Sequence, residues 1–276
     1  MLPGYHTAGL LQHDLAGAIE ELAAMGYRAV AVRPQHGRLS RSDPWFGQQL
    51  LRLADVTARH DLQLILDLDT CFLHNAWKSR GPALASAATG EARAARDGIE
   101  TWLEIAAESK ASMVTFACGQ IGQEANSNTE YALTQLACEL DYLVNVASEL
   151  EVAIALRPRH GDSIATVAQW ERLRHWLKTE GLGLAADIGE MLQGHEIPLA
   201  DRLERNRDCL SCIYICDRSA GQTKDQPIGT GDIAHDRLIS GLVGINFQGP
   251  AIIRIDGHSQ LGLGLAEQGI QIFDKS

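Results

Sequence analysis

Aspartates, arginines and a tyrosine recur at the downstream ends of short apolar segments in this sequence. A carboxylate can carry a proton or bind a cation, and a guanidinium can hold an anionic group. Gathered at one place, such groups would form a site for proton transfer or for binding a small charged or polar molecule. The side chains that fit this pattern are His6, Arg33, Asp67, Asp69, Arg157, Asp187, Tyr214, Cys216, Arg254 and Asp256.

Two further patterns in the sequence could serve such a site. Asp67 and Asp69 lie two positions apart, so their charges would raise one pKa and create an acid/base group, unless inward arginines neutralise them. Trp77 and Lys78, in the long stretch after that segment, could cover a pocket or lie on the surface. The residues predicted to bind a ligand are His6, Asp67, Trp77, Lys78, His160, Tyr214, Asp217 and His258.

The spacing of the cysteines favours free thiols over a metal site or a disulfide framework. Cys209 and Cys212 form a CxxC pair, with Cys216 four residues further on. A structural zinc site needs four ligands and usually a second pair at a distance, which the sequence does not offer. We therefore predict that all six cysteines are free thiols.

Apolar segments alternate with amphipathic stretches along the whole chain. The segments expected to form strands are 3–8, 28–34, 62–69, 112–118, 151–158, 181–187, 211–217 and 251–256. The stretches expected to form helices are 14–25, 45–60, 91–109, 128–149, 166–179, 198–208, 232–243 and 262–273. Asp14 is suited to cap the first helix, Ser127 with Glu130 the fourth, and Asp232 the seventh.

Eight strand–helix units in one chain predict the α/β class and a single (β/α)8 TIM barrel, with residues 1–276 as one domain. An open doubly wound sheet is the alternative. Along the fifth segment Ile154 and Leu156 share one face, and Ala155 and Arg157 share the other. Branched side chains should face the helices, so the polar set should point into the barrel. Active sites of this fold lie at the carboxyl ends of the strands.

The composition excludes several classes of protein. The 276 residues carry 24 basic and 35 acidic side chains, a net charge of −11, which argues against binding to nucleic acid or to an anionic membrane. The sequence shows no signal peptide and no apolar run long enough to span a membrane. We expect a soluble, cytoplasmic protein, and a homo-oligomer is compatible with the sequence.

Several motifs, in this order and spacing, resemble the xylose isomerase-like barrels, which include sugar phosphate isomerases and epimerases. The resemblance covers nearly the whole chain. It rests on GYHTAG at 4–9, IALRPRHGD at 154–162, LGLAADIGE at 182–190, IYICDRSAG at 213–221 with IGTGDIAHD at 228–236, and AIIRIDGHSQ at 251–260.

The resemblance implies a divalent cation such as Mg, Mn or Zn, bound by Glu, Asp, His and Glu from strands five to eight. The matching positions here are Arg157, Asp187, Tyr214 and Asp256. Only Asp187 keeps its identity, and Glu190 replaces the histidine that usually follows it. Arginine has no lone pair for a metal and stays cationic. We therefore expect no metal or other cofactor, with Asp187 and Asp256 as the remaining weak candidates for metal ligands.

Two hypotheses of different classes follow for the function. The first is a sugar or sugar-phosphate isomerase/epimerase that acts without metal, with Asp187, Asp256 or Asp67 carrying protons and Arg157 stabilising an enediolate. The second is a catalytically silent relative that binds a polyol or a small acid. An abasic-site endonuclease is a remote alternative, because it would need zinc-binding histidines and a basic face. In all versions Arg157 is expected to bridge Asp187 and Asp256.

Overall fold

Eight parallel strands close into a barrel, so the alternative of an open sheet is wrong. The computed structural model of the protein describes residues 1–35, 38–69, 73, 77, 81–86, 88–119, 129–219 and 221–274. Each strand pairs with the next along the chain, and the last pairs with the first. The strands are β1 (Leu2–His6), β2 (Ala29–Val32), β3 (Gln63–Asp67), β4 (Met113–Phe116), β5 (Ala153–Leu156), β6 (Leu182–Asp187), β7 (Leu210–Ile215) and β8 (Pro250–Ile253).

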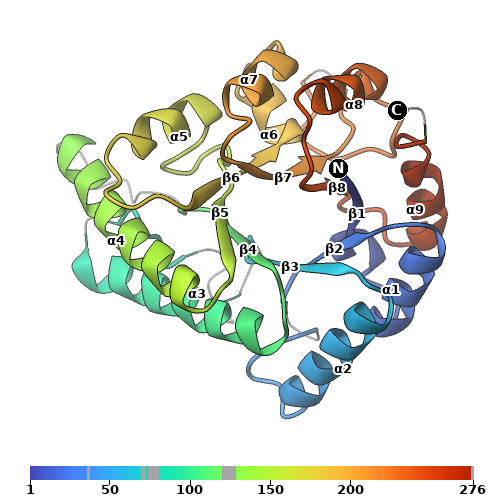
Figure 1. Ribbon diagram of the computed structural model, residues 1–276, viewed down its shortest axis with the longest axis horizontal. Helices are drawn as coiled ribbons and strands as arrows, with labels where there is room; N and C mark the ends of the chain where they lie inside the picture. Colours follow the sequence, from blue (N-terminus) through green and yellow to red (C-terminus); the bar gives the residue numbers. More distant parts are fainter. Residues whose placement is uncertain are drawn as a thin grey trace.

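Helices surround this barrel (Figure 1), and every stretch predicted to be helical contains one. They are α1 (Leu15–Ala24), α2 (Phe46–Arg59), α3 (Thr89–Glu108), α4 (Thr129–Glu149), α5 (Val167–Arg174), α6 (Ile188–Gln193), α7 (Leu199–Arg205), α8 (His235–Gly244) and α9 (Gly262–Ile270). A short 3-10 helix, Thr7–Leu10, directly follows β1. Among the described residues, no helix is both long and apolar enough to cross a membrane.

The helix caps follow the sequence in part. The Asp14 side chain accepts the backbone N–H of Gly17 and caps α1 as predicted. Ser127 lies outside the described residues. The prediction for Asp232 is wrong, because α8 begins at His235 with Ala234 at its N-cap position. The short helix α6, whose first backbone N–H groups are accepted by Asp187, was not predicted.

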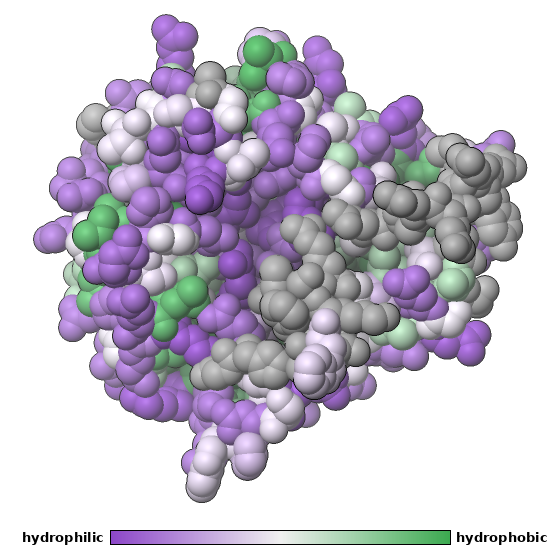
Figure 2. All heavy atoms as spheres, turned by 180° about the vertical axis from the view of Figure 1, so that it is seen from behind, coloured by the Kyte–Doolittle hydropathy of each residue, from purple (hydrophilic) through white to green (hydrophobic). Residues whose placement is uncertain are grey.

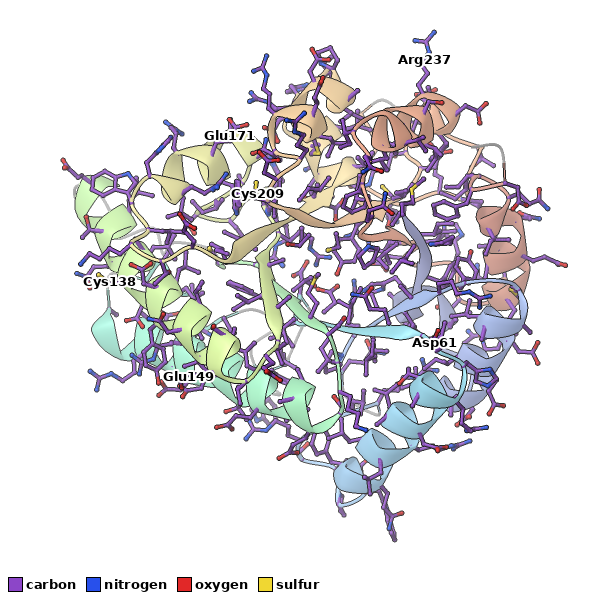
Figure 3. The ribbon with its side chains drawn as sticks, viewed as in Figure 1. Asp61, Cys138, Glu149, Glu171, Cys209 and Arg237 are labelled. Carbon is purple, nitrogen blue, oxygen red and sulfur yellow. The ribbon has the colours of Figure 1, made fainter. Side chains whose placement is uncertain are left out.

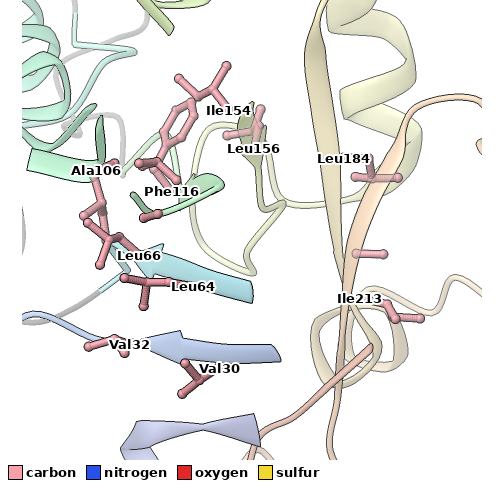
Figure 4. Close-up of a cluster of buried hydrophobic side chains, with 14 of the residues drawn as sticks. Val30, Val32, Leu64, Leu66, Ala106, Phe116, Ile154, Leu156, Leu184 and Ile213 are labelled. Carbon is pink, nitrogen blue, oxygen red and sulfur yellow. The ribbon is translucent and has the colours of Figure 1, made fainter. Parts of the chain in front are cut away.

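Strand parity sorts the side chains as predicted. The branched residues Val30, Leu64, Ile154 and Ile213 belong to the large cluster between strands and helices (Figure 4). A second, smaller cluster fills the barrel interior. Its members are Ala29, Ala31, Ile65, Met113, Ala155, Ala185, Cys212, Tyr214 and Ile252. Small side chains dominate this interior, which leaves room for the large polar groups above it.

The cysteines described by the structure are free thiols: Cys118, Cys138, Cys209, Cys212 and Cys216. Cys138 is exposed on α4, far from Cys209 beside β7 (Figure 3). Cys209 is half-buried, and its Sγ lies 3.4 Å from Arg174 Nη1. Cys212 is buried inside the barrel. The CxxC pair therefore places its two sulfur atoms in different surroundings.

Reaction with a disulfide reagent should separate these thiols. Burial raises the pKa of Cys118, Cys212 and Cys216, so the thiolate that reacts is scarce and inaccessible there. We expect Cys138 to react quickly in the native protein and all six cysteines to react in denaturant. A Cys138→Ser control should lose the fast phase. Fewer than six thiols after unfolding without reductant would contradict this prediction.

Candidate functional site

A group of charged side chains crowds the carboxyl ends of the strands. Figure 2 shows the molecule from behind, where hydrophilic side chains surround a hollow near the centre. His6 and Asp67 end β1 and β3, Asp187 ends β6, and Arg157 and Arg254 directly follow β5 and β8. Five segments far apart in sequence therefore meet at the barrel mouth, as the closed parallel barrel requires.

Asp67 is the centre of the first half of this group. Its carboxylate accepts His6 Nε2 at 2.8 Å, an Arg157 terminal nitrogen at 3.2 Å and the Thr115 hydroxyl at 3.1 Å. His6 Nδ1 accepts the backbone N–H of Ala8, so the proton of the neutral ring lies on Nε2. Burial lowers the pKa of His6 more than its bond to Asp67 raises it. His6 is therefore a neutral donor, and not a base, toward Asp67.

Arg157 joins this centre to the barrel interior. It is fully buried, pairs with Asp67 and Asp69, and lies over the Tyr214 ring at 4.8 Å. The Tyr214 hydroxyl lies 2.7 Å from Thr115, which in turn bonds Asp67. Burial alone would raise the pKa of Asp67, but the charge of Arg157 and the bond from His6 lower it. Neutralisation by arginine therefore prevails over the raised pKa that two close aspartates would produce.

Asp187 and Arg254 form the second half of the mouth. Arg254 Nη1 lies 2.5 Å from Asp187 Oδ2, and its Nε lies 3.3 Å from Asp225 Oδ2. Asp187 Oδ1 accepts the N–H groups of Gly189 and Glu190 at the start of α6. Both oxygens of the Asp187 carboxylate are thus engaged in capping and ion pairing.

The predicted bridge by Arg157 between Asp187 and Asp256 is therefore wrong. Arg157 reaches across the barrel to β3, where Asp67 and Asp69 lie. Arg254 pairs with Asp187 instead. Asp187 ends β6 and Arg254 directly follows β8, and these two strands lie on either side of β7. Asp67 pairs with Arg157 and Asp187 pairs with Arg254, and the sequence did not indicate which arginine lies near which aspartate.

Asp256 is the most accessible carboxylate of the mouth. Its side chain is 40% exposed and its Oδ2 accepts Arg33 Nη2 at 3.2 Å. Its Oδ1 is buried and has no hydrogen-bond partner among the residues that the structure describes. Burial would raise the pKa of Asp256, but Arg33 and Arg254 lower it to about 2. The group is a carboxylate at neutral pH whose side chain is partly exposed at the mouth, with one buried oxygen that lacks a partner among the described residues.

The other predicted ligand-binding residues are less central. Asp217 is fully buried and accepts backbone N–H groups of the following loop, from Arg218, Gly229, Gly231 and Ile233. His258 Nε2 contacts the backbone oxygen of Asp225 at 3.1 Å, and His160 and Trp77 are exposed. Lys78 lies outside the described residues.

Three residues of the mouth were not predicted from the sequence. Thr115 shares a strand face with Met113, so strand parity could have pointed to it. Arg159 follows Arg157 by two residues and pairs with Asp69. Asp225 lies in the loop after β7, where no periodic pattern reveals which way a side chain points.

The sequence pattern of xylose isomerase-like TIM barrels matches residues 19–276. The chain belongs to this family. No curated protein matches its sequence. Its fold is similar to solved structures of a D-allulose 3-epimerase from Methylomonas sp. (TM-score 0.76, 14% identity, 100% of this chain and 97% of that one) and a 3-keto-D-glucoside 4-epimerase from E. coli (0.77, 15%, 100% and 100%). A probable 3-DHS dehydratase from Bacillus anthracis is equally similar (0.76, 12%, 99% and 99%).

A divalent cation at the xylose isomerase-like mouth does not fit these side chains. Of the four positions that the family resemblance implies, Arg157 offers no lone pair and Tyr214 is turned to Thr115. Asp187 is engaged by Arg254 and by the start of α6, and Asp256 lies beside Arg33. In the described part of the chain, no three His, Cys, Asp or Glu side chains group closely enough to hold a metal ion.

Acid should destabilise the fold through this mouth. Because burial lowers the pKa of His6, the unfolded chain takes up a proton there below about pH 6.5, before the folded protein does. Burial would raise the pKa values of Asp67 and Asp256, but the charges of nearby arginines lower them overall. The unfolded chain therefore takes up protons at these groups first, and more stability is lost below about pH 4. We expect the free energy of unfolding to decrease from pH 7 to 5 and again below pH 4.

Urea denaturation at each pH measures this effect. A His6→Gln variant should flatten the profile between pH 7 and 5 by up to about 1.4 kcal/mol per pH unit, the value for one proton. Parallel profiles for the variant and the wild type would show that His6 does not titrate as inferred.

Proposed function

We propose that this protein is a sugar or sugar-phosphate isomerase/epimerase-like barrel that binds a small polyhydroxylated ligand at its mouth without a divalent ion. The observation that carries the proposal is that two buried arginines pair with the carboxylates of the mouth. Arg157 pairs with Asp67 and Asp69, and Arg254 pairs with Asp187 and Asp225. Arg159 and Arg218 supply the second charge of each group, on Asp69 and Asp225. Guanidinium groups are fixed in charge at every relevant pH, so they can supply the positive field that the family otherwise obtains from a metal.

Partly exposed side chains around this buried charge would contact the ligand. Asp69, Arg33 and Arg159 keep 15%, 17% and 16% of their side chains exposed, and Asp256 keeps 40%. Carboxylate oxygens accept hydrogen bonds from hydroxyl groups, and guanidinium groups donate to carbonyl or phosphate oxygens. This combination suits a ketose or its phosphate. The name of the structurally similar D-allulose 3-epimerase contains one such sugar, D-allulose.

Asp256 is the residue that we propose to carry the proton. Asp67 and Asp187, the other proposed carriers, have exposures of 0% and 1% and are fully engaged in ion pairs. Asp256 Oδ1 is the one carboxylate oxygen among the described mouth residues without a partner. In the reaction, after a rotation of the side chain that brings it to the surface, this oxygen would take the proton from the carbon beside the sugar carbonyl. A nearby arginine would stabilise the enediolate, and the protonated carboxyl group or solvent would return a proton to it.

A second candidate function, ligand binding without turnover, is favoured by one observation. Arg33 and Arg254 outweigh burial and lower the pKa of Asp256 to about 2. A general base works best when its pKa lies near the operating pH, so a carboxylate of this kind is a weak base. Binding through the same residues would persist even if no proton moved.

Proton exchange with solvent separates these functions. The protein, with EDTA present, is incubated in D2O with D-allulose, D-tagatose, D-fructose and their phosphates, and the sugars are followed by NMR. We expect deuterium to enter at a carbon beside the carbonyl of one compound, and an Asp256→Asn variant to lose this exchange while still binding. Binding without exchange would favour the silent relative. The absence of both would contradict the proposed function.

A further inference from the structure

A second recess lies beside the barrel mouth, between α6, α7, the loop after β7 and the start of α8. Its volume is about 630 Å³, within the range of sites that hold small organic ligands. The residues that line it do not include Asp67 or its partners His6, Thr115 and Arg157. Its apolar wall is formed by Leu192, Ile197, Pro198, Leu199, Ile233 and Leu238.

One buried arginine interrupts this apolar wall. Arg218 lines the recess with only 6% of its surface exposed. Its Nε and Nη2 lie 2.9 Å from Asp225, whereas Nη1 is buried without a hydrogen-bond partner among the described residues. Gly189 makes room for it, since a Cβ there would lie 2.5 Å from the guanidinium carbon. A buried donor without a partner is costly, which indicates that an acceptor belongs beside it.

The charges around the recess indicate what kind of acceptor this is. Besides Arg218, the lining includes Arg237, which projects from α8 away from the barrel (Figure 3), and Asp232. The side chains of the lining thus sum to a net positive charge, on a protein whose net charge is −11. Two acids outside the lining, Asp225 at 2.9 Å and Glu190 at 3.7 Å, offset part of the charge of Arg218 through its Nη2. A guanidinium nitrogen binds a carboxylate more strongly than a neutral acceptor.

We propose that this recess binds a small carboxylic acid with an apolar body. The carboxylate would accept Arg218 Nη1, after a small movement of the side chain, and the apolar body would pack on Leu192, Leu199 and Leu238. The recess adjoins the mouth through Asp225, which pairs with both Arg218 and Arg254, but its lining differs from the residues proposed to bind the sugar, and the proposal does not depend on that function being correct. A purely apolar ligand would leave Arg218 Nη1 without a partner, and a sugar would meet a surface that is mostly apolar.

Octanoate and 1-octanol test this assignment on the wild-type protein, because they share a chain and differ in charge. Saturation-transfer NMR titrations measure the dissociation constant of each. We expect octanoate to bind in the submillimolar range and octanol at least about tenfold more weakly, the difference expected for one charge-assisted hydrogen bond. No saturable binding of octanoate, or equal binding of both compounds, would overturn the proposal.

Two variants locate the binding. Ala234 is exposed and lines the recess, so Ala234→Trp should fill it and abolish octanoate binding. Ala58 is exposed on α2, away from the recess, and Ala58→Trp should bind octanoate as the wild type does. Octanoate binding that survives Ala234→Trp would overturn the proposal. So would a dimer that Ala234→Trp dissociates, since a second copy would then occupy the recess. Neither result bears on proton exchange at the mouth, so failure here leaves the proposed function standing.

Discussion

An Arg157→Met variant is expected to lose about 3–5 kcal/mol of unfolding free energy, the usual cost of breaking a buried ion pair from one side. Arg157 is fully buried and neutralises Asp67, which is also fully buried. Removing the guanidinium leaves that carboxylate with neutral donors, which are His6, Thr115 and the backbone N–H of Asp69, and leaves the Asp69 side chain with Arg159. Methionine keeps a similar apolar stem, so the loss reports the charge. Urea denaturation followed by circular dichroism measures it.

Two further variants make this result interpretable. Arg59 forms an exposed ion pair with Asp55 on α2, so Arg59→Met should cost less than about 1 kcal/mol. Adding Asp67→Asn to Arg157→Met should recover part of the lost stability, because no unpaired charge then remains buried. A loss for Arg157→Met no larger than that for Arg59→Met would show that the buried pair is not important for stability.

The second large effect is expected when the mouth is given back the side chains of a metal site. Arg157→Glu with Tyr214→His supplies the carboxylate and imidazole that the family resemblance implies. Because Arg254 still neutralises Asp187, we expect this double variant to bind Mn²⁺ only weakly. Adding Arg254→Gln frees that carboxylate, and the triple variant should bind one Mn²⁺ at least about 100-fold more tightly than the double variant.

Folding must be checked in this series, because Arg157→Glu introduces a third carboxylate beside Asp67 and Asp69. Circular dichroism with and without Mn²⁺ shows whether the triple variant is folded and whether the ion raises its melting temperature. The single variant Arg254→Gln is the control and should bind no Mn²⁺. If the double variant already binds as tightly as the triple one, Arg254 does not compete with a metal for Asp187.

The fold could be predicted from local patterns because a barrel repeats one rule eight times. Alternation along β5 correctly placed Ile154 outside and Ala155 inside, and the expectation that polar side chains point into the barrel correctly placed Tyr214. The short helix α6 was missed because its cap, Asp187, had been interpreted only as a site residue. The start of α8 was misplaced because the turn that precedes it is fixed by the distant Asp217.

The site could be predicted only as a set of residues, and not as a set of pairs. Parity shows that Arg157, Asp187 and Asp256 approach the same mouth. It does not show that Arg157 reaches Asp67 while Arg254 takes Asp187, because that choice depends on distances across a closed barrel. Asp225 joins the second pair from a loop, and no local signal in the sequence places it there.

Calorimetric titration of Mn²⁺ into the wild-type protein, after treatment with EDTA and dialysis, tests most directly whether arginines stand in for the metal. Because Arg157 and Arg254 pair with Asp67 and Asp187, we predict no saturable heat of binding up to millimolar Mn²⁺. Tight binding of one ion per chain, lost on Asp187→Asn, would contradict this interpretation of the mouth.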